Sequence, residues 1–178
     1  MSKKVLIISG SPRKGGNSDK LCDRFAEGAR DAGNDVTKLS LADRRVGFCT
    51  GCACCEQANR CIIDDDVPGI IDRMMASDVI VMASPVYFYS MDAQMKALID
   101  RSVSVWTVMK DKVFYFIMTS AEDTDTVMDC TLECFRGFIS CIGGSTEGGV
   151  IYAKGVHSRG EVEGTEYMQQ AYDMGRSI

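Results

Sequence analysis

The strongest constraint on this chain is a short apolar run that breaks into a glycine-rich turn, VLIISGSPRKGGNS at residues 5–18. A run rich in Val, Leu and Ile predicts a buried parallel strand. The turn after Gly10 is small and polar, and Asn17 and Ser18 stand where a helix cap belongs. Strand, tight loop and helix N-terminus form an arrangement that binds phosphate, because backbone N–H groups and the helix dipole converge there.

Basic side chains strengthen this phosphate interpretation. Arg13 and Lys14 lie in the turn and can neutralise a doubly charged phosphate. The turn matches neither the Walker loop, since Gly15 is followed by Gly16 and Asn17, nor the G-x-G-x-x-G fingerprint. The alternative is an ordinary surface turn, although few such turns combine three glycines, two basic residues and a helix cap.

Strand-like and helix-like segments alternate along the rest of the chain. We expect strands over residues 35–41, 78–83, 113–118 and 148–153. We expect helices over residues 19–32, after a cap at Asp66, from Ser90 or Asp92 to about Arg101, over 126–142 and over 167–174. This pattern predicts an α/β fold with a flavodoxin-like, doubly wound, five-stranded parallel sheet of order 2-1-3-4-5 and helices on both faces. Its ligand crevice lies at the carboxyl ends of strands 1 and 3.

Length and charge limit the classes of protein to consider. The 178 residues suit a single domain, 1–178, that includes a cysteine-rich loop at about 42–66. A net charge of −5 without a basic block argues against nucleic acid or a membrane surface as partner. No segment suits a signal peptide or a transmembrane helix. We therefore expect a cytoplasmic protein, in which the nine cysteines are thiols or metal ligands.

A second candidate site follows the expected third strand, in SPVYFYS at residues 84–90. Proline and consecutive aromatic residues at the ligand edge of a sheet suit a flat, partly apolar ring. The alternative is that Tyr87 and Phe88 are core or interface aromatics. A phosphate loop and a ring-binding loop on neighbouring strands together describe the cofactor FMN.

Two segments, GSPRKGGNS and DVIVMASPVYFYSMDAQMKALIDR, resemble the flavin-binding segments of the NADPH-dependent FMN reductase family of flavodoxin-like proteins. The resemblance covers roughly residues 1–101 and is loose from about Thr107 onward. It implies FMN phosphate contacts at Ser11, Arg13, Asn17 and Ser18, ring contacts from Pro85, Val86, Tyr87 and Phe88, and a further contact from Ser120.

Five cysteines fall between residues 49 and 61. Four of them, Cys49, Cys52, Cys55 and Cys61, are followed by IIDDD and resemble the compact cluster motif of the iron–sulfur flavoproteins within that family. Four thiolates in so short a span can hold a [4Fe–4S] cluster. The alternatives are reduced thiols without a metal, and zinc or a redox disulfide, although the paired knuckles of zinc sites usually lie further apart. Cys54 adds a fifth thiol, which leaves the choice of ligands open.

Other residues suggest no chemistry. Cys130, Cys134 and Cys141 are spaced along one expected helix, and we interpret them as small buried hydrophobic residues. His157, the only histidine, receives no role. We assign no catalytic acid or base, because a flavin carries out its own chemistry.

The expected function is that of an FMN-dependent oxidoreductase of the iron–sulfur flavoprotein type, with NAD(P)H as donor and a small molecule or protein as electron partner. One alternative is an NAD(P)H-dependent FMN or quinone reductase without a cluster. The other is a flavodoxin-like electron carrier with no substrate of its own. We also expect a homo-oligomer, since the cysteine-rich loop can reach its own flavin's rim or lean over a neighbour's flavin.

Overall fold

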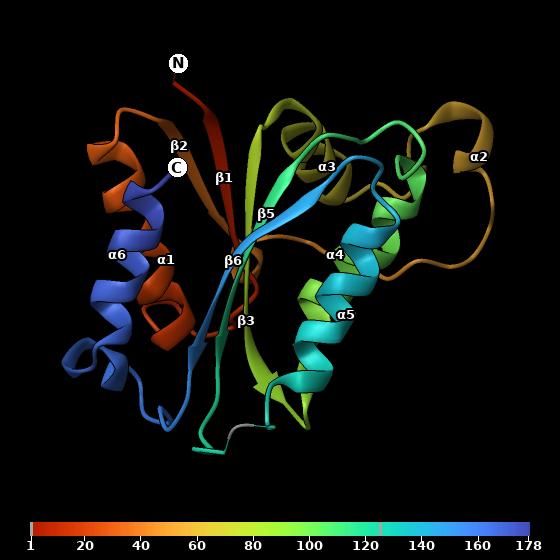
Figure 1. The fold of residues 1–178 in the computed structure, drawn as a ribbon. Helices are drawn as coiled ribbons and strands as arrows, with labels where there is room; N and C mark the ends of the chain where they lie inside the picture. Colours follow the sequence, from red (N-terminus) through yellow and green to blue (C-terminus); the bar gives the residue numbers. More distant parts are fainter. Residues whose placement is uncertain (1, 125) are drawn as a thin grey trace.

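The computed structural model describes residues 2–124 and 126–178, and its centre is a parallel sheet of order β2-β1-β3-β5-β6 (Figure 1). The five parallel strands are β1 (Lys4–Ser9), β2 (Asp35–Ser40), β3 (Val79–Tyr87), β5 (Val113–Thr119) and β6 (Thr146–Ala153). Counted along the chain, their order is 2-1-3-4-5, so the predicted flavodoxin-like topology is confirmed. The short strand β4 (Ser90–Met91) pairs antiparallel with β3, outside this path.

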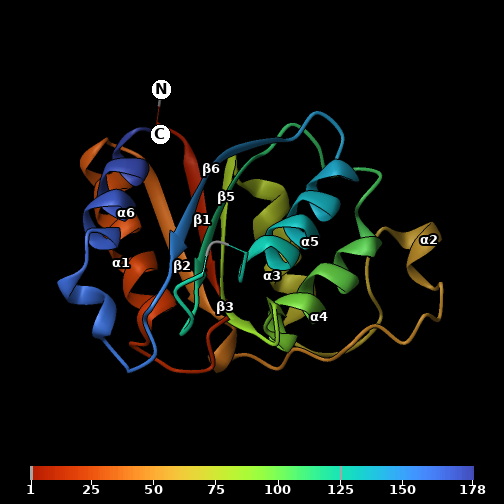
Figure 2. The same ribbon diagram turned by 60° about the horizontal axis from the view of Figure 1, so that its bottom comes forward.

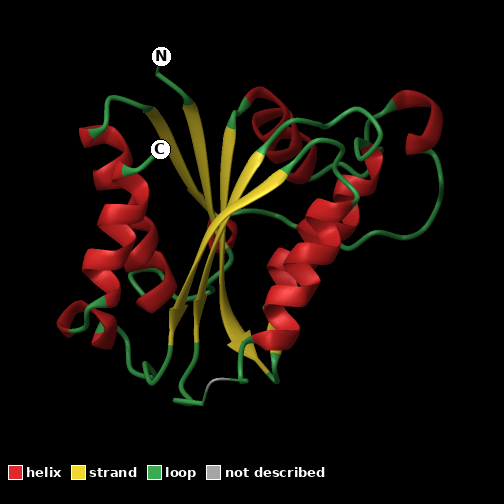
Figure 3. Cartoon of the chain, in the orientation of Figure 1, coloured by secondary structure: helices red, strands yellow, loops and turns green. Residues whose placement is uncertain are grey.

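Helices cover both faces of the sheet. On one face lie α1 (Asn17–Asp31) and α6 (Tyr167–Arg176), and on the other lie α3 (Val67–Ala76), α4 (Ala93–Arg101) and α5 (Asp129–Ser140) (Figures 1 and 3). Each face has its own core of buried side chains, with Phe25 prominent in one and Phe116 and Phe135 in the other. The alternating side chains of the strands supply both cores, as expected for a sheet buried on both sides.

Helices α1 and α6 lie unusually close together. A Cβ at Gly28 would lie 2.1 Å from the carbonyl oxygen of Tyr172, and one at Gly175 would lie 2.1 Å from that of Phe25. Only glycine allows this backbone approach. The C-terminal helix is thereby fixed against the helix that follows the first loop.

Several elements differ in extent from the prediction. β3 runs on to Tyr87 rather than ending at residue 83, because residues 84 and 85 continue the ladder with β5. β6 begins at Thr146 rather than at residue 148, and the ring of Tyr115 fills the space that a Cβ on Gly148 would take. α5 covers a shorter span than 126–142. The expected loop 119–125 ends at residue 125, which lies outside the described residues.

The cysteine-rich segment leaves the sheet after β2. It contains the short helices η1 (Leu41–Asp43) and α2 (Cys55–Ala58), and α2 lies beyond α4 as seen from the strands (Figures 1 and 2). The remaining short helices are η2 (Ser102–Ser104) and η3 (Glu161–Gly164). Among the described residues, no helix combines the length and the apolar character that crossing a bilayer requires.

Candidate functional site

The loop between β1 and α1 folds back onto the first turn of the helix. Gly15 has a left-handed backbone conformation, with φ of +63°, and its N–H donates to Asp19 Oδ2 at 2.8 Å. Gly16 is the N-cap of α1, and a Cβ there would lie 2.9 Å from the carbonyl oxygen of Arg13. Glycine at both positions allows the tight turn that brings the helix N-terminus to the wall of a cavity.

This cavity, of about 220 Å³, lies at the carboxyl ends of β1, β3 and β5. Seven of the nine residues for which the sequence predicts flavin contacts line it: Ser11, Arg13, Asn17, Ser18, Pro85, Val86 and Tyr87. The rest of its wall consists of Gly16, Thr119, Ala121, Val156, His157 and Arg159. The topology therefore joins two motifs that lie about 70 residues apart in the sequence, at the edge where doubly wound sheets bind ligands.

Asn17 uses its whole side chain to hold a distant loop. Its Nδ2 donates to the carbonyl oxygens of Val156 at 3.2 Å and Ser158 at 3.0 Å, and its Oδ1 accepts the N–H of Val162 at 3.3 Å. The prediction that Asn17 caps α1 is wrong, because these long-range partners take up its amide. Its predicted contact with a phosphate stays a prediction.

Two of the serines predicted to contact the flavin have partners at or near the end of β5. Ser18 Oγ lies 2.7 Å from Thr119 Oγ1, so Ser18 also fails to cap α1. Ser120 is buried, and it does not line the cavity. Its N–H donates to the Ala153 carbonyl and its hydroxyl accepts the Glu122 N–H. Its hydroxyl therefore contacts the neighbouring backbone, and its flavin contact stays a prediction.

The aromatic residues at the end of β3 and in the turn after it lie at the surface. Tyr87 is 43% exposed and Phe88 is fully exposed, so neither belongs to the core of this chain. Phe88 and Tyr89 form the two-residue turn between β3 and β4, with φ of +50° and +61°. Bulky residues rarely adopt this conformation, and such outliers concentrate at functional sites. Tyr87 lines the cavity, whereas Phe88 stands outside it.

A buried carboxyl group joins the loops of the cavity. Asp92 accepts the N–H of Met95 at Oδ1, and its Oδ2 lies 2.7 Å from the hydroxyl of Ser84 in β3. A Cβ at Gly10 would lie only 2.3 Å from the same Oδ2. Burial raises the pKa of Asp92, although the hydrogen bonds from Ser84 and Met95 act in the opposite direction.

The loop after β6 was not predicted to take part in the site. It contributes Val156, His157 and Arg159 to the cavity wall. The signal available in the sequence was the position of this loop, since the carboxyl end of the fifth parallel strand meets the same edge of the sheet. His157, to which we assigned no role, therefore lies in the candidate site.

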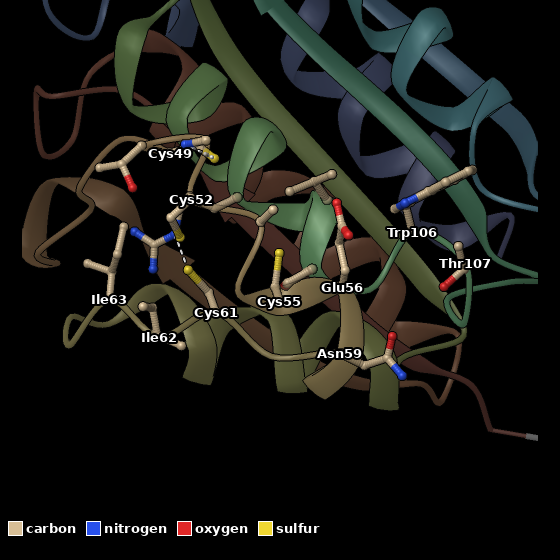
Figure 4. Close-up of a pocket in the computed structure, with 16 residues that line it drawn as sticks. Cys49, Cys52, Cys55, Glu56, Asn59, Cys61, Ile62, Ile63, Trp106 and Thr107 are labelled. Atoms are coloured by element: carbon tan, nitrogen blue, oxygen red, sulfur yellow. Dashed lines mark hydrogen bonds between the residues drawn. The ribbon is translucent and has the colours of Figure 1, made fainter.

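A second cavity, of about 480 Å³, is formed mainly by the cysteine-rich segment. All four predicted metal ligands line it: Cys49, Cys52, Cys55 and Cys61. Figure 4 shows the four cysteine side chains along one part of the cavity wall and Trp106 on another part of it. The two cavities share no lining residue, so the cysteine-rich loop does not reach the rim of the first cavity in this arrangement.

Arg101 is a buried residue in the wall of this second cavity. Its Nε donates to Cys61 Sγ at 3.1 Å, and its Nη1 donates to the carbonyl oxygen of Gly47 at 2.9 Å. Both of its Nη atoms contact the carboxylate of Asp65, at 2.8 and 3.0 Å. One buried guanidinium therefore holds both ends of the cysteine-rich loop.

The cysteine pocket offers donors of the right kind for a cluster. All nine cysteines are free, and the four predicted ligands line one hollow within a span of 13 residues. Within residues 2–124 and 126–178, however, no three His, Cys, Asp or Glu side chains are close enough together to hold a metal ion. The four thiols are thus of the right kind for a thiolate-bound cluster. To bind one, the cysteine-rich loop has to move so that their sulfur atoms come closer together.

The three cysteines of the α5 region contradict the prediction of burial. Cys130, Cys134 and Cys141 are exposed, and they lie on the face of the helix away from the core. Leu132, Phe135 and Ile139 take the buried positions instead.

Comparison with known proteins agrees with this geometry. A family model described as NADPH-dependent FMN reductase matches residues 3–129. An iron-sulfur flavoprotein of Methanosarcina thermophila is 41% identical over 100 residues, which are 56% of this chain and 52% of that protein. The chain spans about half the length of the curated relatives that it matches.

Solved structures match nearly the whole chain at low identity. An NAD(P)H:quinone oxidoreductase from Methanothermobacter marburgensis has a TM-score of 0.77 at 16% identity, covering 99% of this chain and 96% of the other. An archaeal flavodoxin has a TM-score of 0.64 at 13% identity, covering 98% and 95%. These likenesses establish the flavodoxin-like fold.

Proposed function

Because this chain belongs to the NADPH-dependent FMN reductase family, we propose that it is an FMN-dependent oxidoreductase of the iron–sulfur flavoprotein type. The single observation that carries the proposal is the cavity at the carboxyl edge of the sheet, which is lined by seven of the nine predicted flavin contacts. Its phosphate half offers Arg13 and the N-terminus of α1, and its ring half offers the end of β3.

When bound, FMN supplies hydride acceptance from NAD(P)H and one-electron transfer. The chain's own residues bind and orient it. Arg13 would offset the negative charge of the phosphate, and the first N–H groups of α1 would donate hydrogen bonds to it, as helix N-termini do for anions. Pro85, Val86 and Tyr87 provide a partly apolar wall for the ring, and the exposure of Tyr87 leaves that side of the ring site open to a second substrate.

We propose Cys49, Cys52, Cys55 and Cys61 as ligands of a [4Fe–4S] cluster, which would supply a one-electron carrier. Three observations support this proposal. The four cysteines line one cavity, they are closely spaced in the sequence, and relatives of this chain are named iron-sulfur flavoproteins. Reduced thiols in an NAD(P)H-dependent FMN or quinone reductase remain the alternative, as does an electron carrier without a substrate of its own.

The proposed electron partners are a small molecule or a protein, and the proposed setting is a homo-oligomer in the cytoplasm. Large apolar side chains around the cysteine pocket support an oligomer, since Phe48 is 80% exposed and Ile62 is 63% exposed. The two cavities also share no lining residue, which fits a cysteine pocket that exchanges electrons with the flavin of a neighbouring protomer. Light scattering of the purified protein tests the oligomer, and a monomer at all concentrations would contradict it.

The cofactor proposal is tested by titrating the flavin-free protein with FMN. We expect saturable binding and a loss of about 1.5–3 kcal/mol in Arg13→Gln, the usual scale of a charged hydrogen bond. Arg176→Gln, at the end of α6, is the matched control and should bind as wild type does. Equal FMN affinity in wild type and Arg13→Gln would remove Arg13 from the site.

A further inference from the structure

The loop that follows β6 lies outside the segment matched by the family model, which ends at residue 129. Three contacts from Asn17 hold this loop against the N-terminus of α1. Glu161 Oε2 accepts the N–H groups of both His157 and Ser158 at 2.7 Å, which fixes the turn that carries Arg159. The loop therefore has a defined position over the phosphate half of the cavity.

Two arginines brace this loop and the phosphate loop reciprocally. Arg13 Nη1 donates to the carbonyl oxygen of His157 at 3.3 Å, and Arg159 Nε donates to that of Gly15 at 3.5 Å. A Cβ at Gly15 would lie 3.0 Å from Arg159 Nη2, so this guanidinium lies directly over the turn. Arg13 and Arg159 thus approach one cavity from two loops, 146 positions apart in sequence.

The charged side chains that line the cavity are positive, which favours an anion as its ligand. Both arginines line it, and none of the lining residues that the structure describes is acidic. Lys14 does not contribute, because it pairs with Asp43 instead. Two guanidinium groups facing one small space repel each other unless an anion lies between them. A phosphate with several terminal oxygens can accept from both, and the planar fork of arginine suits this recognition.

We infer that Arg159 is a second phosphate contact, and that it makes the site selective for a flavin phosphomonoester over the flavin that lacks the phosphate. This inference rests on the proposed FMN function. It assigns Asn17 the role of a positioning residue, whose amide holds the Arg159 loop in place.

The test compares FMN and riboflavin as ligands of Arg159→Gln. We expect the dissociation constant for FMN to rise about 10- to 100-fold, the equivalent of one charged hydrogen bond. Riboflavin affinity should stay within about twofold, because riboflavin offers no phosphate oxygen to lose. Arg159→Lys should recover part of the FMN affinity, since it keeps the charge without the fork. Arg176→Gln is again the matched control.

A double-mutant cycle tests the role of Asn17. Arg159→Gln should cost less FMN affinity in an Asn17→Ala background than in wild type, because the loop is no longer held. Thermal unfolding of each variant verifies that it folds.

Each failure has its own meaning. If wild type binds no FMN, the proposed function is contradicted and the inference falls with it. If wild type binds FMN and Arg159→Gln binds it equally well, only the inference is contradicted. An equal loss for FMN and riboflavin would also overturn it, since Arg159 would then act on the ring or on the loop alone.

Discussion

Arg101 and Asp65 form a two-point ion pair at the wall of the cysteine pocket, with Nη1–Oδ2 and Nη2–Oδ1 distances of 2.8 and 3.0 Å. The Arg101 side chain is fully buried. Burial raises the pKa of Asp65, but the hydrogen bonds from Arg101 and from the N–H groups of Gly47 and Val67 outweigh it and hold that pKa below its ordinary value. The pair therefore links the start and the end of the cysteine-rich loop to α4.

Removing Arg101 should destabilise the protein strongly. In Arg101→Met the carboxylate of Asp65 stays buried without its partner, which costs about 3–5 kcal/mol. Arg60→Met is the matched control, because its pair with Asp72 is exposed and such pairs contribute at most about 1 kcal/mol. Denaturant unfolding measures both variants. A loss below about 1 kcal/mol in Arg101→Met would show that the pair does not hold the loop.

The same pair predicts a pH dependence. The folded-state pKa of Asp65 is depressed, so its contribution to stability is present above its ordinary pKa of 3.8 and is lost as pH falls through the folded value. Wild type should therefore lose unfolding free energy more steeply in acid than Asp65→Asn does. If the unfolding free energies of the two proteins fall by the same amount as the pH is lowered, the depressed pKa of Asp65 is contradicted.

Asp92 should behave in the opposite way. Its pKa is raised in the fold, so its contribution is present below the ordinary value of 3.8 and is lost as pH rises through the folded value. Asp92→Asn cannot ionise and keeps an acceptor for Met95. The difference in unfolding free energy between Asp92→Asn and wild type should therefore shift in favour of the variant as pH rises above 3.8. Asp92→Ala loses the cap of α4, at a cost of about 1 kcal/mol. A constant difference between wild type and Asp92→Asn at all pH values would contradict the raised pKa.

Tyr87 should matter for the flavin and little for stability. Since Tyr87 is 43% exposed, Tyr87→Ala should keep the unfolding free energy within about 1 kcal/mol of wild type. The fluorescence or reduction potential of bound flavin should change. Phe135→Ala, at a fully buried position, is the contrasting variant and should cost about 3–5 kcal/mol. A large loss of unfolding free energy in Tyr87→Ala, with no change in flavin fluorescence or reduction potential, would show that Tyr87 stabilises the fold and does not contact the flavin.

The sequence allowed the fold and much of the candidate site to be predicted, because both depend on local patterns. The apolar strands, the glycines of the first loop and the aromatic run that begins at the end of β3 are each visible within a few residues. The topology then requires the carboxyl ends of β1 and β3 to meet. This is why seven predicted residues line one cavity.

Long-range contacts explain what the sequence did not reveal. Asn17 suits a helix cap by local pattern, but partners about 140 residues away occupy its side chain. Arg159 lies in a polar loop with no signature of its own, and the long-range contacts of Asn17 help to hold that loop at the cavity. The exposure of Cys134 was missed because cysteine is compatible with a buried face, while Phe135 beside it takes the core position.

Iron analysis tests the cysteine pocket. After anaerobic reconstitution we expect about four iron and four acid-labile sulfide per chain, as for a [4Fe–4S] cluster, and their loss in Cys52→Ala. Cys134→Ala, at an exposed position on α5, is the control and should keep both. Iron in equal amounts in the two variants, or no iron in a protein that binds FMN, would contradict the proposed ligands.

The central claim is that this chain is an FMN-dependent oxidoreductase, and reduction of its bound flavin tests that claim most directly. The FMN-loaded protein is mixed anaerobically with NADPH or NADH, and the visible absorbance of the flavin is followed against free FMN at the same concentration. The account predicts that the protein-bound flavin loses its absorbance much faster than free FMN with at least one of the two donors, and that an added quinone restores it. Bound FMN that neither nucleotide reduces faster than free FMN would contradict the account.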